Sequence, residues 1–183
     1  MDEHTWTQQT PYGSIQVSAG KDGVRSLRFG WDGARSSAPQ KDDSGDAVPA
    51  QFHKIQQRLE RYFDGDAHAL DDIDIDLSDL SNEFQRSVLT TLRGMIGPGQ
   101  TISYGELAAA VGHPGAARAV GTVMATNPVP IIIPCHRVLA SDGTLGGYGG
   151  GLDMKRELLK MEGAEVKESR RPAAAKESRR PRK

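Results

Sequence analysis

The segment Ile131-Ile132-Ile133-Pro134-Cys135-His136-Arg137-Val138 contains the only cysteine among the 183 residues of the chain. A lone thiol forms no intrachain disulfide and builds no thiolate metal site by itself, so Cys135 is either an inert buried sulfur or a nucleophile. Pro134 stiffens the backbone before the sulfur because its ring fixes φ. His136 and Arg137 place a titratable and a cationic group beside the thiol, which favours the thiolate. The isoleucines predict a buried strand that ends at this turn. These neighbours favour a nucleophile.

Length and composition limit the classes of protein that the chain can represent. A length of 183 residues suits one large domain or two small ones. No run of about 18 apolar residues occurs, so the sequence predicts no membrane-spanning helix. The first residues, Met1-Asp2-Glu3-His4-Thr5, lack the basic and apolar regions of a signal peptide. We therefore expect a cytoplasmic protein in a reducing compartment, where a thiol stays free.

Charge is distributed unevenly along the chain. Residues 167–183 contain eight Lys or Arg and two Asp or Glu, a net charge of +6, which leaves −7 on the remaining residues. This tail repeats the pattern Lys-Glu-Ser-Arg-Arg-Pro and has almost no apolar content, so we expect it to be disordered. It is either a solvated tail or a non-specific contact for nucleic-acid phosphates.

The first half of the chain reads as a small α/β domain, residues 1–80, with no chemistry of its own. Alternating apolar residues predict short strands within 12–31. Residues 33–49 are rich in Ser, Asp, Gly and Pro and read as a loop or linker. One apolar face predicts a helix over 51–63, and the alternation at 74–77 predicts an edge strand.

The second half contains two expected capping boxes, in which an N-cap side chain and the residue three positions later satisfy helix N–H groups. Asn82 and Gln85 open an apolar helix that stops at Gly97-Pro98-Gly99. Ser103 and Glu106 open a short helix over 104–111.

A Gly/Pro turn joins this short helix to a further helix over 116–126, and the pair predicts a helix-turn-helix. The second helix of the pair is nearly bare, and Arg118 is its only charged residue. Its small residues are Ala116, Ala117, Ala119, Gly121 and Ala125. Such a helix reads few base edges, but it can lie close to a nucleic-acid backbone with Arg118 projecting. Alternatively, the small residues allow close helix packing and Arg118 simply faces solvent.

Together these segments resemble the 6-O-alkylguanine-DNA alkyltransferases. The motifs that carry the resemblance are Phe84-Gln85-Arg86, Thr101-Ile102-Ser103-Tyr104-Gly105-Glu106-Leu107-Ala108, Ala117-Arg118-Ala119-Val120-Gly121, Asn127-Pro128, Ile133-Pro134-Cys135-His136-Arg137-Val138 and Gly146-Gly147-Tyr148. The resemblance is densest over 82–163 and looser over 59–65.

The resemblance implies an α+β protein in three parts. Residues 1–80 would form a ribonuclease H-like α/β domain. Residues 81–166 would form a helical, winged-helix-like DNA-binding domain that contains the helix-turn-helix, and 167–183 would be the disordered basic tail. The implied activity is direct reversal of DNA damage in double-stranded DNA. The cysteine irreversibly takes an alkyl group from the 6-oxygen of guanine, and from the 4-oxygen of thymine, so each molecule acts once on a flipped-out base.

The resemblance also assigns roles to individual residues. Cys135 is the nucleophile, His136 activates it through a water, and Glu162 orients the histidine. Tyr104 donates a hydrogen bond to the leaving base, and Asn127 links the helix-turn-helix to the active site. The residues assigned to DNA contact are Arg118, which fills the gap left by the flipped base, together with Tyr104, Ala117, Ala119 and Gly121. The residues assigned to the alkyl-guanine pocket are Pro130, Val138 through its carbonyl, Tyr148 and Gly149.

The implied partner is double-stranded DNA that carries alkylated guanine, with no membrane and no cofactor. We expect a monomer in solution, and cooperative binding along DNA stays open. With no second cysteine, we expect no structural zinc site built on thiolates. Gly149 stands where some members have serine, which removes a hydroxyl from the pocket.

Three rival interpretations remain: a lesion-binding module without repair, a cysteine hydrolase with repeated turnover, and a transcriptional regulator built on the helix-turn-helix.

Overall fold

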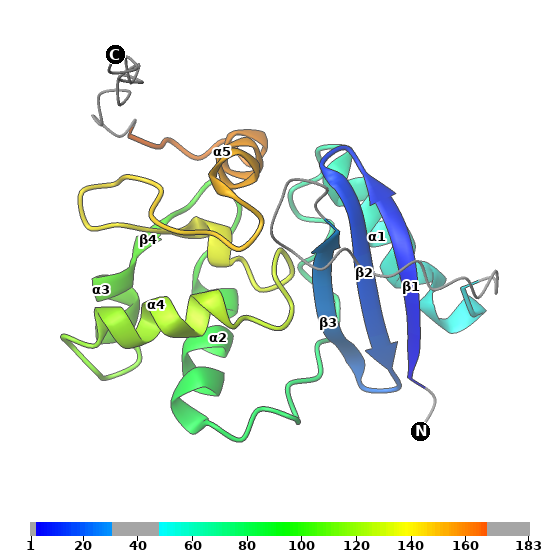
Figure 1. The fold of residues 1–183 in the computed structure, drawn as a ribbon, viewed down its shortest axis with the longest axis horizontal. Coiled ribbons are helices and arrows are strands. Elements are labelled where there is room, and N and C mark those ends of the chain that lie inside the picture. Colours follow the sequence, from blue (N-terminus) through cyan, green and yellow to red (C-terminus); the bar gives the residue numbers. More distant parts are fainter. Residues whose placement is uncertain (1–2, 31–47, 168–183) are drawn as a thin grey trace, which may run out of the picture.

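The computed structural model describes residues 3–30 and 48–167, and all of the expected basic tail after Lys167 and most of the expected linker lie outside this range. The chain forms a mixed α+β structure with a three-stranded sheet, a two-stranded sheet and five α-helices in the described part (Figure 1). In chain order the elements are β1 (His4–Thr10), β2 (Gly13–Gly20), β3 (Gly23–Gly30), the 3₁₀ turn η1 (Ala50–Phe52), α1 (His53–Phe63), α2 (Glu83–Met95), β4 (Ile102–Ser103), α3 (Tyr104–Ala110), α4 (Ala117–Ala125), the 3₁₀ turn η2 (Cys135–Arg137), β5 (Val138–Leu139) and α5 (Leu152–Met161). None of these helices is long and apolar enough to cross a membrane.

Two halves lie side by side in Figure 1. The sheet half, residues 3–30 and 48–80, is an antiparallel sheet in the order β1-β2-β3 with α1 against one face. The helical half, residues 81–167, contains the remaining helices and the short parallel pair β4-β5. Strand β3 is the sheet edge nearest the helical half. One buried hydrophobic core runs through both halves, so apolar burial holds them together.

The expected helices are present close to their predicted bounds, but the expected strands are only partly right. Strand β1 was not predicted, because its buried face carries a glutamine, Gln8, beside Trp6. Residues 74–77 form a single parallel bridge, Val24 to Ile75, in place of an edge strand. The chain turns away there because the carboxylate of Asp76 accepts from the backbone N–H of Ser78 at 2.9 Å and from Arg25 at 2.8 Å.

The predicted strand at Ile131-Ile132-Ile133 is wrong, although all three side chains are buried. The backbone of Ile131 has φ of 73°, and the N–H of Ile133 donates to the carbonyl of Val129 at 2.9 Å, so this segment is a tight turn. A φ in the left-handed region is unfavourable for a β-branched residue and persists only where the surroundings fix it. The run of three isoleucines therefore indicates that the segment is buried, but it does not indicate an extended backbone.

The two capping boxes differ. At Ser103 the box is complete, because the serine hydroxyl accepts from the Glu106 N–H and the glutamate accepts from the Ser103 N–H. At Asn82 only the first half forms, since the side chain of Gln85 donates to the hydroxyl of Thr126 in place of returning to the cap. That bond ties the start of α2 to the end of α4, so a tertiary contact replaces a local one.

Replacement of Gly23 by alanine tests the junction between β3 and residues 74–75. Gly23 has φ of +126°, and an added Cβ would lie 2.4 Å from the carbonyl oxygen of Asp74. Left-handed strain and a clash with backbone both act, so we expect a loss of about 3 kcal/mol in the free energy of unfolding, measured by chemical denaturation. Gly20→Ala is the matched control, because its Cβ meets nothing within 4 Å. Equal stability of the two variants would contradict the assigned contact.

Candidate active site

Cys135 begins the turn η2 and is only 6% exposed. Its N–H donates to the carbonyl of Ile133 at 2.8 Å, which makes the backbone tight before the sulfur. Strand β5 follows at once and pairs with β4, Ile102 opposite Val138. Because β4 leads directly into the capped start of α3, this pairing brings Tyr104 to the same region as Cys135. The two groups are close enough for the Cys135 charge to contribute to a raised pKa of Tyr104, after the larger effect of burial.

The environment of Cys135 favours the protonated thiol, which corrects the expectation that its neighbours favour the thiolate. Burial raises the pKa of Cys135, and this effect outweighs the hydrogen bond from Asn127 and the charge of Lys155. The side chains of His136 and Arg137 both bond to Glu162, and the charge that lowers the pKa of Cys135 comes from Lys155. His136 and Arg137 follow Cys135 in the sequence, but their side chains do not stabilise its thiolate by charge. The thiol therefore needs a base to react.

Glu162 is the C-cap of α5, and its side chain is completely buried. Its Oε1 accepts from His136 Nε2 at 2.9 Å, from Arg137 Nη2 at 2.9 Å and from the hydroxyl of Tyr62 at 2.7 Å. Its Oε2 accepts from Arg137 Nε at 2.8 Å. Burial alone would raise the pKa of Glu162, but the hydrogen bonds and charges of Arg137 and His136 lower it to about 2. The carboxylate is therefore ionised at neutral pH.

This ion fixes the chemistry of His136. An ionised carboxylate only accepts hydrogen bonds, so Nε2 carries the imidazole proton and Nδ1 has the lone pair. Burial lowers the pKa of His136, which keeps the ring neutral at rest, although Glu162 acts in the opposite direction. Nδ1 is buried and has no hydrogen-bond partner among the described residues. His136 thus presents an unoccupied basic atom and a partner that stabilises the protonated ring.

Asn127, just after α4, is bonded to the turn that precedes Cys135. Its Nδ2 donates to the carbonyl of Ile133 at 3.0 Å, and its Oδ1 accepts from the N–H of Val129 at 3.1 Å. The asparagine therefore holds both ends of the left-handed turn at Ile131 and connects the helix pair to Cys135.

Lys155 was missed by the sequence analysis, although it is completely buried. Its ammonium donates to three carbonyls: Val138 at 2.6 Å, Gly147 at 3.3 Å, and Leu145. Burial lowers the pKa of Lys155 to about 8. Its burial could have been predicted from the sequence, because Lys155 lies three and four residues before Leu158 and Leu159 and so shares the buried face of α5. Lys155 fastens the loop between β5 and α5 and places a positive charge near Cys135.

Tyr148 lies in that loop and packs between the two halves. Its ring is 6.0 Å from that of Phe29 on β3 and 6.4 Å from that of His136, centroid to centroid. Its hydroxyl is buried and has no partner among the described residues. A Cβ at Gly150 would lie 2.9 Å from the Tyr148 ring, whereas one at Gly149 would meet nothing within 4 Å. The space beside Gly149 is therefore open. Pro130, from the turn before Cys135, is half-buried.

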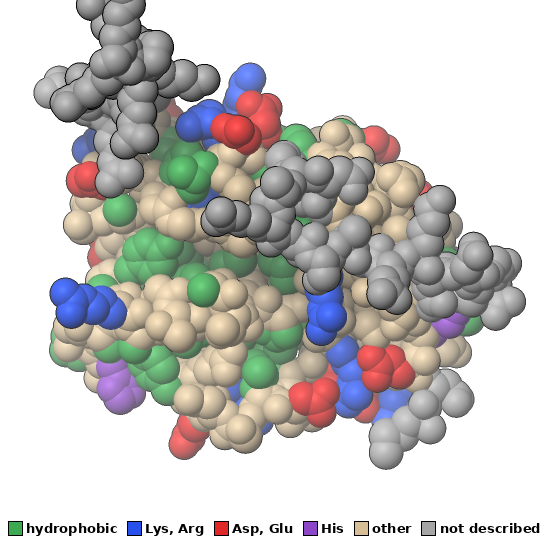
Figure 2. All heavy atoms as spheres, viewed as in Figure 1, with side chains coloured by type: hydrophobic (Ala, Val, Ile, Leu, Met, Phe, Trp, Pro, Cys, Tyr) green, Lys and Arg blue, Asp and Glu red, His purple; other side chains and the backbone are tan. Residues whose placement is uncertain are grey.

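Of the residues assigned to DNA contact, Tyr104 begins α3, and the other four lie on α4. Arg118 and Ala119 are exposed, and Ala117 and Gly121 are partly exposed. Figure 2 shows mostly neutral and hydrophobic side chains over α4, with basic atoms at its left end. A complete cap opens α3, whereas α4 has no side-chain cap, so the N–H groups at its start are available to an anion.

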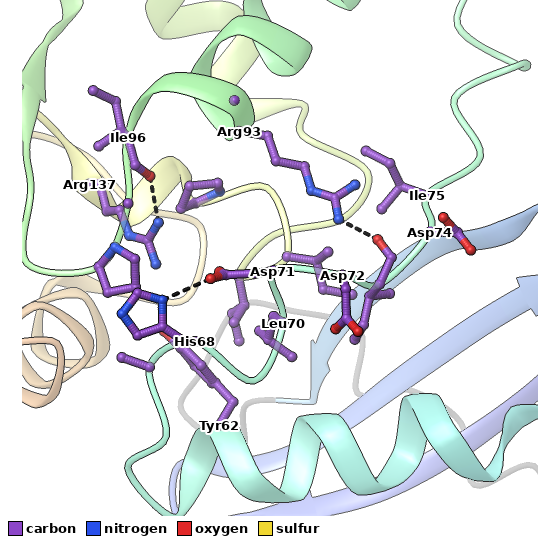
Figure 3. Close-up of a pocket in the computed structure, with 18 of the residues that line it drawn as sticks. Tyr62, His68, Leu70, Asp71, Asp72, Asp74, Ile75, Arg93, Ile96 and Arg137 are labelled. Atoms are coloured by element: carbon purple, nitrogen blue, oxygen red, sulfur yellow. Dashed lines mark hydrogen bonds and ion pairs between the residues drawn. The ribbon is translucent and has the colours of Figure 1, made fainter.

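A pocket of about 800 Å³ opens between the halves behind this site (Figure 3). Tyr62 and Arg137 line it, and Arg137 also donates to the carbonyl of Ile96 at 2.6 Å. Arg93 lines the opposite side and bonds to the carbonyl of Ile73. Cys135 does not line this pocket. Within residues 3–30 and 48–167, no three His, Cys, Asp or Glu side chains gather as metal ligands.

A buried cysteine with a histidine–carboxylate base, placed beside a helix pair, defines a nucleophilic group-transfer protein. The family model for the DNA-binding domain of 6-O-methylguanine DNA methyltransferase matches residues 83–164. The methylated-DNA–protein-cysteine methyltransferase of Methanosarcina acetivorans is 38% identical over 156 residues, which are 85% of this chain and 96% of that protein. The enzyme of the same name from Mycolicibacterium paratuberculosis is 47% identical over 114 residues, 62% of this chain and 67% of that one.

Solved structures agree with this assignment. The structure of Mycobacterium tuberculosis OGT in complex with DNA superposes with a TM-score of 0.71 at 36% identity, covering 87% of this chain and 92% of that one. The chain belongs to the methylated-DNA–protein-cysteine methyltransferase family.

Glu162→Gln tests the buried ion. A group whose folded pKa is depressed contributes stability above its unfolded pKa of about 4.3, and this contribution is lost as the pH falls toward about 2. The variant leaves Arg137 without a full counter-charge, so we expect it to be about 3 kcal/mol less stable at pH 7. The difference from the wild type should narrow by pH 3, measured by urea denaturation at both pH values. A pH-independent difference would show that Glu162 is not ionised in the folded protein.

Proposed function

We propose that this protein repairs double-stranded DNA by moving an alkyl group from the 6-oxygen of guanine to Sγ of Cys135, once per molecule. The observation that carries the proposal is a buried thiol, Cys135, followed directly in sequence by His136, whose Nε2 is engaged by Glu162 at 2.9 Å while Nδ1 has no partner among the described residues. Transfer from the 4-oxygen of thymine belongs to the same proposal, because that oxygen carries an alkyl group in an equivalent chemical setting.

The reaction begins with removal of the thiol proton. Nδ1 of His136 accepts it, directly or through a water, and the resulting imidazolium is stabilised by the Glu162 carboxylate. The thiolate electron pair then forms a bond to the alkyl carbon, and the bond from that carbon to the guanine oxygen breaks. The base takes the bonding electrons and recovers a proton. Tyr104 acts as the hydrogen-bond donor that stabilises the developing charge on the base.

The product explains a single use. Cys135 becomes a thioether, which has no acidic proton for His136 to remove and is a poor leaving group. The protein is therefore consumed in the stoichiometry of one alkyl group per chain.

The burial of Cys135 supports base flipping. A sulfur that is 6% exposed does not reach a base that is stacked in a duplex. The nucleotide must leave the stack, at a cost of a few kcal/mol. The small outer face of α4 permits close approach to the DNA backbone through Ala117, Ala119 and Gly121, and Arg118 occupies the gap that the base leaves.

The flipped base would lie beside Tyr148, Pro130 and Gly149, with its amino group on the carbonyl of Val138. That carbonyl already accepts from Lys155 Nζ at 2.6 Å. A carbonyl oxygen has two lone pairs, so a second donor is accepted. Lys155 thus holds the acceptor in place for the base.

The same proposal includes the finer architecture. We propose that the sheet half, within residues 1–80, is a ribonuclease H-like domain and that residues 81–166 form a winged-helix-like DNA-binding domain. The protein acts as a cytoplasmic monomer on DNA. Of the rival interpretations, a cysteine hydrolase requires repeated turnover, and a lesion-binding module or a transcriptional regulator requires binding without transfer. One measurement of stoichiometry therefore separates the proposed function from these rivals.

Stoichiometric transfer is the direct test. Duplex DNA with a labelled methyl group on the 6-oxygen of guanine should transfer one equivalent of label per chain to Cys135, located by peptide mass spectrometry. Cys135→Ala should keep DNA affinity within about twofold and transfer no label, because it removes only the nucleophile. More than one equivalent, or no label on folded and reduced protein, would overturn the proposal.

Arg118→Ala tests the extrusion role. The variant should bind duplex DNA more weakly and transfer more slowly, each by about tenfold, because the vacated stack is no longer filled and a phosphate-side charge is lost. The rate should recover on a lesion placed in single-stranded DNA, where no stack has to be filled. Thr122→Ala, on the same exposed face of α4, is the matched control. An equal loss on single- and double-stranded substrates would contradict the assigned role.

A further inference from the structure

One donor to the Glu162 carboxylate comes from the other half of the molecule. Tyr62 is the penultimate residue of α1 in the sheet half, and its hydroxyl donates to Oε1 of Glu162 at 2.7 Å across 100 residues of sequence. The ring is 1% exposed, so water does not compete for this bond. Figure 3 shows the Tyr62 side chain directed from α1 toward the helical half.

The oxygen that Tyr62 contacts is the one that bonds His136. Oε1 therefore divides its charge among Tyr62, His136 and Arg137, whereas Oε2 accepts from Arg137 alone. Donation of a hydrogen bond to a carboxylate stabilises its charged form and lowers its basicity. The hydrogen bond from Tyr62 reduces the negative charge that Oε1 offers to the imidazole. The hydroxyl therefore acts on His136 through Glu162.

The sheet half is docked firmly enough to hold Tyr62 in position. The N–H of Leu27 on β3 donates to the carbonyl of Pro128 at 2.9 Å, one residue after Asn127. Phe29 on the same strand packs against Tyr148. Tyr62 is itself fixed by an edge contact with Phe63, centroids 5.4 Å apart. These contacts limit the freedom of the hydroxyl to leave Glu162.

We propose that Tyr62 is a positioning residue of the alkyl-transfer site, which holds Oε1 of Glu162 against His136 and restrains the proton affinity of the imidazole. The proposal rests on the proposed function, since it assigns His136 as the base. Tyr62 does not touch Cys135 or the base, and it acts only through the carboxylate.

The sign of the effect follows from the groups that face the pair. Arg137 engages both oxygens of Glu162, and Lys155 and Arg137 oppose protonation of His136 by their charges. Tyr148 packs against the imidazole with an unionised hydroxyl, because burial raises its pKa well above the usual value. Loss of the Tyr62 hydroxyl leaves all of these in place and makes Oε1 more basic. Protonation of His136 then becomes easier, and the base is lost at higher pH.

Tyr62→Phe removes the hydroxyl and keeps the ring. Single-turnover transfer to Cys135 should fall about three- to tenfold at pH 6 and approach the wild-type rate above pH 8, an acid limb displaced upward by about half to one pH unit. Tyr12→Phe is the matched control, because Tyr12 packs against Phe63 in the same half and makes no side-chain hydrogen bond to Glu162. Its pH profile should equal that of the wild type.

Two further measurements make the result decisive. The melting temperature separates folding from chemistry: a uniform rate loss at every pH, accompanied by lower stability, or an unchanged acid limb, would overturn the proposal. Alkylation of Cys135 by iodoacetamide across the same pH range reads the same base without DNA, and its acid limb should also move upward. If the wild type fails to take methyl from DNA, the proposed function falls, and the iodoacetamide profile still decides the role of Tyr62.

Discussion

The buried carboxylate of Glu162 is the group on which the rest of the structure depends. It is completely enclosed, and it is tolerable there only because Arg137 pairs with both of its oxygens. Arg137 in turn satisfies the carbonyl of Ile96 just beyond α2. The ion thus connects α1, the end of α2, η2 and the end of α5 in one network. A polar network of this kind demands complete pairing, and it selects a single arrangement of the helices.

Burial of Cys135 disfavours the thiolate, which is the reactive form of the sulfur. The proposed base is a separate residue, His136. Burial keeps the sulfur protonated because its effect on the pKa of Cys135 outweighs the charge of Lys155, while Arg137 is bonded to Glu162. His136 retains a buried nitrogen, Nδ1, with no partner among the described residues. In the proposed mechanism one proton transfer to His136 generates the nucleophile, and a permanently ionised sulfur is not needed.

Local signals in the sequence predicted the parts of the site that depend on neighbouring residues. The capping box at Ser103, the helix pair and the turn at Cys135 are all of this kind. Lys155 and Tyr62 escaped notice because their roles arise from contacts over many residues, which residue spacing does not reveal. The strand expected at Ile131 failed for a different, local reason: the side chain of Asn127 imposes a turn on a segment whose composition favours an extended backbone. The sequence also did not show that the Arg137 side chain bonds to Glu162, and for that reason the prediction of a thiolate at Cys135 was wrong.

The separation of 100 residues between Tyr62 and Glu162 has a consequence for biosynthesis. Glu162 is nearly the last described residue to leave the ribosome, and it must close a long loop to reach a helix made much earlier. Until that closure, Cys135 is an ordinary thiol in an incomplete chain with no organised base. Assembly of the reactive centre is therefore coupled to completion of the whole fold, so a nascent or truncated chain lacks the organised proton acceptor of the finished molecule.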